Sequence, residues 1–259
     1  MKRAPNIFFG HGSPMNVIED NQFNKNLREL GIKFSLQNYK GIICISAHYQ
    51  TDGLYFDESA HPKTIYDFYG FPKNLYELIY SAPGDPLLAQ RLSNELNGKT
   101  STNWGFDHGA WNVLWHLFPE ANIPVVMMSL DYRLTFAEHF KLGERLKKYR
   151  EEEYIILSSG NIVHSFKGID FSNTNPPLKP ALNFNRYVQD KIVNKNFNDL
   201  IYFEKDILED AKFSINSAEH YLPLLYTLGA TFEDEKLNIF NNDIIFSTLS
   251  MMSVYTESL

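Results

Sequence analysis

Residues 7–14, Ile-Phe-Phe-Gly-His-Gly-Ser-Pro, form a short apolar run that stops at a histidine between two glycines and then meets a proline. This pattern predicts a strand that ends by presenting His11. Glycine on both sides permits positive φ and the close approach of another group, and Pro14 cannot continue a ladder of hydrogen bonds. We therefore expect the imidazole of His11 to face a cleft.

The same design recurs in two other runs. Residues 41–48, GIICISAH, are rich in β-branched side chains and end at His48. Residues 154–161, YIILSSGN, are apolar and then small, and His164 follows three residues later. Ligands of open α/β sheets gather outside the carboxyl ends of the strands. The sequence thus predicts a single α/β domain, with a central sheet flanked by helices, in which these three imidazoles share one crevice.

Two more histidines are predicted to begin helices. Asp107 is a typical N-cap, which places His108 in the first turn, where the helix dipole favours a neutral imidazole. His220 precedes Pro223, and proline is tolerated only near a helix start, so His220 is expected at the beginning of the last long helix. His116 and His139 lie within predicted helices, and we assign His116 to packing and His139 to the surface or to packing.

These five strand-end and helix-start histidines point to a metal. Neutral imidazole is the commonest metal ligand, and a catalytic site needs three protein ligands and an open position. The chain contains no HxxxH or HExxH pair that would fix two ligands on one helix. The spacing therefore leaves open which three of them bind.

Composition narrows the class of protein. The 259 residues carry a net charge of −7, which argues against a nucleic-acid partner. The one cysteine, Cys44, excludes an intramolecular disulfide. No run approaches the ~18–20 apolar residues of a membrane span, and the N-terminus lacks a signal-peptide core. We expect a cytoplasmic protein with one domain over residues 1–259.

Other segments carry weaker signals. Leu27 and Leu30 lie on one face of a predicted helix that we expect to stop at Gly31. The aromatic segment 49–82 has no clear period, and it is equally typical of a binding loop and of a loop that covers the core. Residues 243–255 resemble a single closing strand.

Six motifs follow one another along most of the chain: FFGHGSPMN (8–16), ISAHYQ (45–50), IYDFYGFP (65–72), GFDHGAWNVL (105–114), SSGNIVHSF (158–166) and SAEHYLPLLYTLGA (217–230). Together they resemble the class III extradiol ring-cleavage dioxygenases. The most similar subgroup is the 4,5-DOPA dioxygenase extradiol-like proteins, within the superfamily of the protocatechuate 4,5-dioxygenase β subunit. The resemblance implies one α/β domain with a central mixed sheet and the active site at strand carboxyl ends.

Site roles are also implied by the resemblance. His11, His48 and His220 match the family's metal ligands, His164 its acid/base, and His108 a histidine that hydrogen-bonds substrate or oxygen. The expected reaction opens a catechol ring with O2 on Fe(II), beside the two hydroxyls. The partners are then a small catechol and O2, without nucleic acid or membrane, and the oligomeric state stays open.

One departure leaves the metal open. The wider superfamily uses two histidines and a carboxylate, whereas this subgroup places His220 third, with Glu219 beside it. An all-imidazole site suits zinc as well as iron, and His164 could close it as a fourth ligand. We expect zinc in the isolated protein and Fe(II) as the catalytic metal. The alternatives are a zinc-dependent hydrolase and a non-catalytic metal-binding relative.

Overall fold

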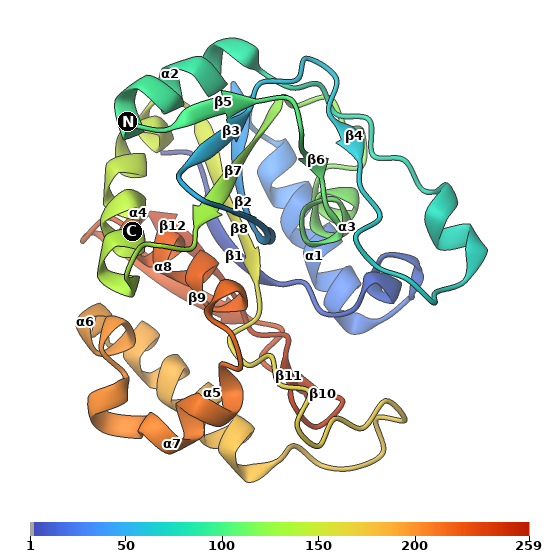
Figure 1. Cartoon of the computed structure of the whole chain (residues 1–259), viewed down its shortest axis with the longest axis vertical. Coiled ribbons are helices and arrows are strands. Elements are labelled where there is room, and N and C mark those ends of the chain that lie inside the picture. The colour runs from blue at the N-terminus through green and yellow to red at the C-terminus, as the bar shows by residue number, and fades with distance from the viewer. Residues whose placement is uncertain (1–2, 259) are drawn as a thin grey trace.

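A mixed sheet of eight strands, in the order β5-β3-β7-β2-β8-β1-β12-β9, forms the core of the molecule (Figure 1). The computed structural model describes residues 3–258. The strands of this sheet are β1 (Asn6–Gly10), β2 (Gly41–Thr51), β3 (Tyr55–Asp57), β5 (Lys99–Ser101), β7 (Val125–Asp131), β8 (Tyr154–Gly160), β9 (Glu235–Phe240) and β12 (Ser253–Ser258). Two small ladders join β4 (Lys63–Thr64) to β6 (Gly105–Phe106) and β10 (Ile244–Ile245) to β11 (Leu249–Ser250).

The centre of the sheet is parallel and its margins are mixed. β7, β2, β8 and β1 run parallel, while β12 is antiparallel to both β1 and β9, and β3 is antiparallel to β7. Parallel strands are covered on both faces, which explains why β7 and β8 read as nearly continuous apolar runs. Their carboxyl ends meet at one edge, as the sequence predicts, and the mixed sheet confirms the expected α/β fold.

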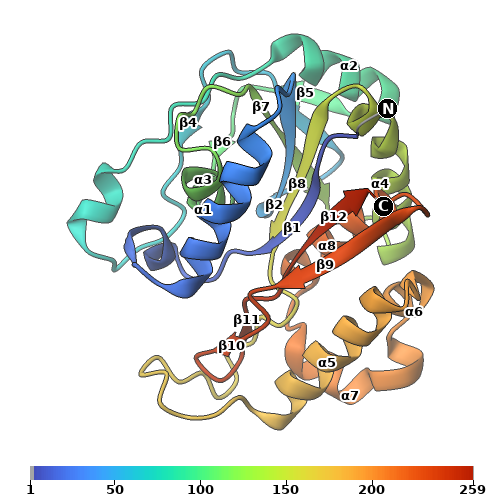
Figure 2. The ribbon, with the colours of Figure 1, turned by 180° about the vertical axis from the view of Figure 1, so that it is seen from behind.

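Helices cover both faces of the sheet. They are α1 (Gln22–Ser35), α2 (Pro86–Leu96), α3 (His108–Leu117), α4 (Phe136–Glu151), α5 (Lys179–Val193), α6 (Phe197–Ile201), α7 (Glu204–Ser214) and α8 (Leu222–Gly229). In Figure 2, α1 and α3 lie on one side of the central strands and α4 and α8 on the other, and α5, α6 and α7 form a group below the sheet. No helix within residues 3–258 is both long and apolar enough to span a membrane.

Each face of the sheet has its own hydrophobic core. Side chains alternate along β2, so Ile42 and Cys44 pack with Trp111 of α3, whereas Ile43 and Ile45 belong to the core that contains Tyr226 of α8. All six of these side chains are buried. The two helix layers therefore hold the central strands, and the residues that follow them, in fixed positions.

The prediction that the first helix stops at Gly31 is wrong. α1 continues through this glycine to Ser35. A Cβ atom at position 31 would lie 2.3 Å from the carbonyl oxygen of Leu117 in α3. Gly31 is therefore needed for the close approach of two helices, and this tertiary contact outweighs its tendency to end a helix.

Two strand predictions also need correction. β2 does not end at His48 but continues to Thr51, with a register shift against β7 between Ile45 and Gln50. The expected closing strand over residues 243–255 is instead a small hairpin, β10–β11, followed by β12. The register shift interrupts the regular alternation of side chains near His48, and β2 then continues beyond it.

Candidate metal centre

All five predicted histidines meet at the carboxyl edge of the parallel strands. His11 follows β1 and His48 lies in β2, and their ring centroids are 5.1 Å apart. The ring of His220, in the short turn before α8, lies 5.4 Å from that of His11 and 5.1 Å from that of His48. His108 begins α3 with its ring 4.1 Å from that of His48, and His164 stacks on His220. The sequence therefore identified a real spatial cluster.

Two of these rings point their Nε2 atoms at each other. The Nε2 atoms of His11 and His48 are 3.3 Å apart. Two nitrogen ligands on one ion, each at about 2.0–2.1 Å, lie roughly 3.3 Å apart when the bonds meet near the tetrahedral angle. This pair therefore fits a shared metal without rearrangement.

The third ligand is less clear from distance alone. Ligand atoms of His11, His48 and His108 all lie within 4.8 Å of one another, and this is the group of possible ligands that the described residues contain. The sequence motifs favour His220 in place of His108. Both histidines are buried beside the first two, but His220 is not part of the 4.8 Å group, so distance alone favours His108.

The Nδ1 atoms of the candidate ligands are held by oxygen acceptors. The Nδ1–H of His11 donates to Ser159 Oγ at 2.9 Å, and that hydroxyl donates to the carbonyl of Gly109 at 2.5 Å. His220 Nδ1 lies 3.1 Å from Glu219 Oε1. Metal-bound histidines almost always use their second nitrogen in this way, which leaves the Nε2 lone pair free for the metal.

One carboxylate serves two of the rings. Asp67 Oδ2 lies 3.2 Å from His48 Nδ1, and Asp67 Oδ1 lies 2.9 Å from His108 Nδ1. Sequence reasoning missed this residue, because it lies in the irregular aromatic segment and no spacing links it to either histidine. The available signals were its place in the motif IYDFYGFP and its position among aromatic residues, in a segment equally typical of a binding loop and of a loop that covers the core.

The environment keeps these imidazoles neutral, as metal ligands must be. Burial, followed by the nearby rings of His48, His220 and His108, lowers the pKa of His11 well below its usual value. Burial likewise lowers the pKa of His48. An all-nitrogen donor set of neutral imidazoles suits zinc, iron, copper or nickel. The residues present thus fit a bound divalent metal.

His164 differs from the other four histidines. Its ring lies parallel to that of His220, and Phe166 packs edge-on against it at 5.1 Å. Among residues 3–258, no hydrogen bond holds either of its ring nitrogens. The two histidines expected within helices are buried elsewhere: His139 contacts Tyr226 and His116 lies on α3.

Aromatic rings line one side of the cluster. Phe68 packs edge-on against His108 at 5.7 Å, and it also contacts Trp111 and Tyr76. Tyr66 donates from its hydroxyl to the carbonyl of Leu78 at 2.7 Å, which ties the segment to itself. Segment 49–82 therefore has both expected functions. It packs on the core where Phe68 contacts the buried Trp111, and it borders the site where Phe68 contacts His108.

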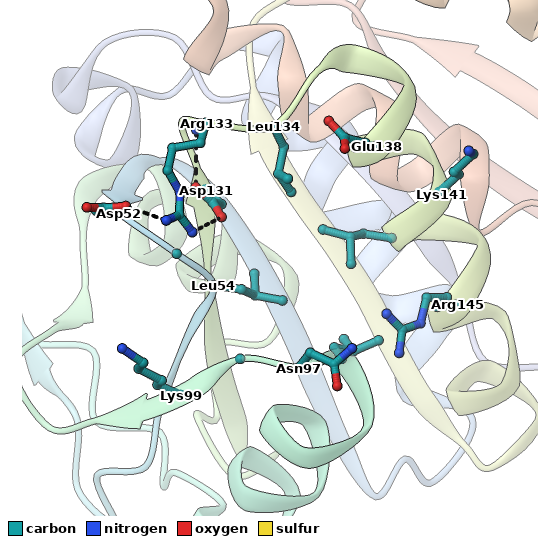
Figure 3. A pocket seen from close by; sticks show the side chains of 14 residues that line it. Asp52, Leu54, Asn97, Lys99, Asp131, Arg133, Leu134, Glu138, Lys141 and Arg145 are labelled. Atoms are coloured by element: carbon teal, nitrogen blue, oxygen red, sulfur yellow. Dashed lines mark hydrogen bonds and ion pairs between the residues drawn. The ribbon is translucent and has the colours of Figure 1, made fainter.

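A separate cavity of about 480 Å³ lies between β3, β7, α2 and α4 (Figure 3). Its floor is apolar, and Arg133 on its rim contacts Asp52 and Asp131, each at 2.8 Å. None of the five clustered histidines is among the described residues that line it. The candidate metal centre therefore lies outside this cavity.

Comparison with known proteins gives a consistent answer. Residues 5–255 match the family described as the catalytic LigB subunit of aromatic ring-opening dioxygenase. The chain is 39% identical to 4,5-DOPA dioxygenase extradiol of Escherichia coli K12, over 97% of this chain and 94% of that protein. It is 34% identical to 4,5-DOPA dioxygenase extradiol of Beta vulgaris, over 91% and 90% of the two chains.

A solved structure agrees with the fold. The crystal structure of an uncharacterized protein from Escherichia coli K12 superposes with a TM-score of 0.84 at 35% identity, covering 98% of this chain and 99% of that one. The histidine cluster, the mixed sheet and the sequence similarity thus lead to one conclusion. The chain belongs to the LigB family of aromatic ring-opening dioxygenases, in the extradiol subgroup that its motifs resemble.

Proposed function

We propose that this enzyme opens the ring of a DOPA-like catechol with O2, outside the two hydroxyls, at one metal held by His11, His48 and His220. The observation that carries the first two ligands is the 3.3 Å separation of the Nε2 atoms of His11 and His48, with both Nδ1 atoms held by oxygens. His220 is proposed as the third from the sequence motifs and from its contact with Glu219. When bound, Fe(II) would supply the redox chemistry that lets O2 react with a chelated catechol.

The stacking of His164 on His220 supports different roles for the two. Their rings are 3° from parallel with centroids 3.6 Å apart. A metal lies close to the plane of an imidazole that binds it, so two parallel stacked rings cannot both bind one ion. Glu219 holds Nδ1 of His220, as expected for a ligand. We therefore assign His220 to the metal and do not propose the closed four-histidine site.

His164 is then the acid/base. Its ring nitrogens are free of partners within residues 3–258, so one of them can accept a proton from a catechol hydroxyl and later return it. Burial lowers the pKa of its ring to about 3, so the imidazole is neutral before substrate binds and can accept that proton. His108, whose Nδ1 is held by Asp67, presents Nε2 to the same space and is proposed to orient substrate or oxygen.

The substrate class follows from the relatives and from the cleft wall. Proteins 39% and 34% identical to this chain are named 4,5-DOPA dioxygenase extradiol. Phe68, which packs edge-on against His108, offers a flat apolar surface that suits an aromatic ring. A catechol can thus be held by its hydroxyls at the metal and by its ring against this wall.

The metal and the location of the protein complete the proposal. We propose that the isolated protein carries zinc, which imidazole ligands bind well, and that Fe(II) is the catalytic metal. We also propose a cytoplasmic location, since the free, buried Cys44 suits a reducing compartment.

Oxygen consumption tests the function directly. Protein stripped of metal and loaded with Fe(II) without oxygen is mixed with DOPA or simple catechols, and O2 uptake and a yellow product are followed. We expect one O2 per ring opened, with none for tyrosine, which lacks the second hydroxyl. The zinc-loaded protein should be inactive. Absence of uptake with every catechol, with iron verified in the site, would refute the proposal.

A further inference from the structure

We propose that Asp67 is the positioning residue of the metal centre. Its single carboxylate fixes the proton of His48 and the proton of His108 on Nδ1, and so turns both Nε2 lone pairs into the same space. The inference rests on the proposed metal-dependent function, and it adds a residue on which both histidines depend.

The contacts of Asp67 involve both oxygens. Oδ1 accepts from the backbone N–H of His108 and from its ring Nδ1–H, each at 2.9 Å. Oδ2 lies 3.2 Å from Nδ1 of His48. The side chain is 17% exposed. Both of its oxygens lie against N–H groups or ring nitrogens of His48 and His108, so the carboxylate is placed to accept from two rings.

A short ladder places Asp67 beside the start of α3. β4 pairs with β6 in parallel, and the N–H of Ile65 donates to the carbonyl of Phe106 at 2.7 Å. The indole N–H of Trp111 donates back to the carbonyl of Ile65 at 3.0 Å. The chain therefore runs alongside β6 and the first turn of α3, and it reaches Asp67 opposite His108.

The chemical consequence concerns tautomers. A neutral imidazole carries one N–H, and an ionised carboxylate can only accept, so each ring in contact with Asp67 keeps its proton on Nδ1. Nε2 then has a free lone pair. With the proton on Nε2 the same ring could not bind a metal through that atom. Because the two rings share one carboxylate, neither can rotate without losing a charge-assisted hydrogen bond.

Asp67 also accepts the backbone N–H of His108, so a purely structural role must be separated from a positioning one. The D67N variant does this, because its amide oxygen can keep both bonds to His108. Its amide nitrogen, however, can only donate toward His48. We expect the proton of His48 to move to Nε2 while α3 stays intact.

The first measurement uses metal-free protein with ¹⁵N-labelled histidine. Long-range ¹H–¹⁵N NMR spectra report which ring nitrogen of each of the eight histidines carries the proton. We expect Nδ1–H for His48 and His108 in the native protein, assigned through H48Q and H108Q, and Nε2–H for His48 in D67N. The control is D57N, since Asp57 is a buried carboxylate outside the site that contacts Ser59. An Nε2–H tautomer of His48 or His108 in the native protein overturns the proposal without any variant.

The second measurement is metal affinity, by competition of metal-free protein with a chelator for Zn²⁺. D67N should bind Zn²⁺ about 10–100-fold more weakly than the native protein does. D57N should bind Zn²⁺ as tightly as the native protein. Affinity of D67N within about twofold of native, with both tautomers unchanged, refutes the role of Asp67. If the native protein shows these tautomers but never consumes O2, the proposed function fails and the positioning role stands.

Discussion

The rings of His164 and His220 lie face to face, 3° from parallel, with their centroids 3.6 Å apart. Because only one of two stacked rings can have a given ion in its plane, this contact supports the proposed division into a ligand, His220, and an acid/base, His164. We predict that His220→Ala loses the metal, whereas His164→Ala keeps it and loses about 10²–10⁴-fold in ring-opening rate. Metal analysis and O2 uptake on both variants test this. If His164→Ala lost the metal and His220→Ala kept it, His164 would be the ligand and His220 the acid/base.

A second prediction distinguishes His108 from the ligands. His11→Ala and His48→Ala should each strip the metal, since the Nε2 atoms of these rings lie 3.3 Å apart. His108→Ala should retain it and lose turnover. Metal content after dialysis is the measurement, with Phe68→Ala as a control that alters the wall beside His108 without removing a nitrogen. If His108→Ala is metal-free while His220→Ala is loaded, the third ligand is His108.

Acid should weaken the fold through buried histidines outside the site. His139 is 0% exposed, and burial lowers its pKa to about 4 from 6.5. Between these values the unfolded chain binds more protons than the native one, so the free energy of unfolding falls as pH falls through this window. The effect of one such group reaches up to about 3 kcal/mol.

Replacement of His139 tests this dependence. Urea unfolding of metal-free protein is compared at about pH 7.5 and about pH 5. The His139→Gln variant should lose less stability between the two conditions than the native protein. His61→Gln, at an exposed position, should behave like the native protein. An equal loss in His139→Gln and in the native protein would contradict the prediction.

A buried ion pair should be important for stability but not for the metal. Arg150 donates to Glu235 at 2.7 Å and to the carbonyl of Ala230 at 2.6 Å, and the side chains of the pair are each 1% exposed. Glu235→Gln leaves the guanidinium charge buried without a partner, which costs about 3–5 kcal/mol. Urea unfolding measures the loss of free energy of unfolding. The folded Glu235→Gln protein should still bind metal.

The control for this pair is an exposed one. Glu209→Gln, which removes the surface partner of Lys212, should change the free energy of unfolding by less than about 1 kcal/mol. A comparable cost for Glu235→Gln would show that the buried pair has no special role.

Local signals in the sequence were sufficient for most of the site. Glycines around His11, the N-cap Asp107 before His108 and the proline after His220 each act within a few residues, and the structure places these histidines as expected. The Thr135 capping box is likewise present at the start of α4. Positions that depend only on neighbours along the chain are predictable in this way.

What the sequence could not predict depends on distant contacts. Gly31 lies inside a helix because α3 approaches it, and β2 continues past His48 because its ladder with β7 resumes. Asp67 lies near two histidines only after β4 has paired with β6. The helices α6 and α7 follow a polar stretch with little periodicity. Each of these features depends on contacts between segments that are far apart in the sequence and meet only in the folded protein.

The five clustered histidines come from positions between 11 and 220, so the site is assembled only when the whole sheet has formed. A metal can therefore bind the native chain far better than the unfolded one. By mass action, each tenfold rise of free metal above its dissociation constant adds about 1.4 kcal/mol to the free energy of unfolding. Metal supply and resistance to unfolding are thus linked in this enzyme, and a cell short of metal would hold a chain that unfolds more readily.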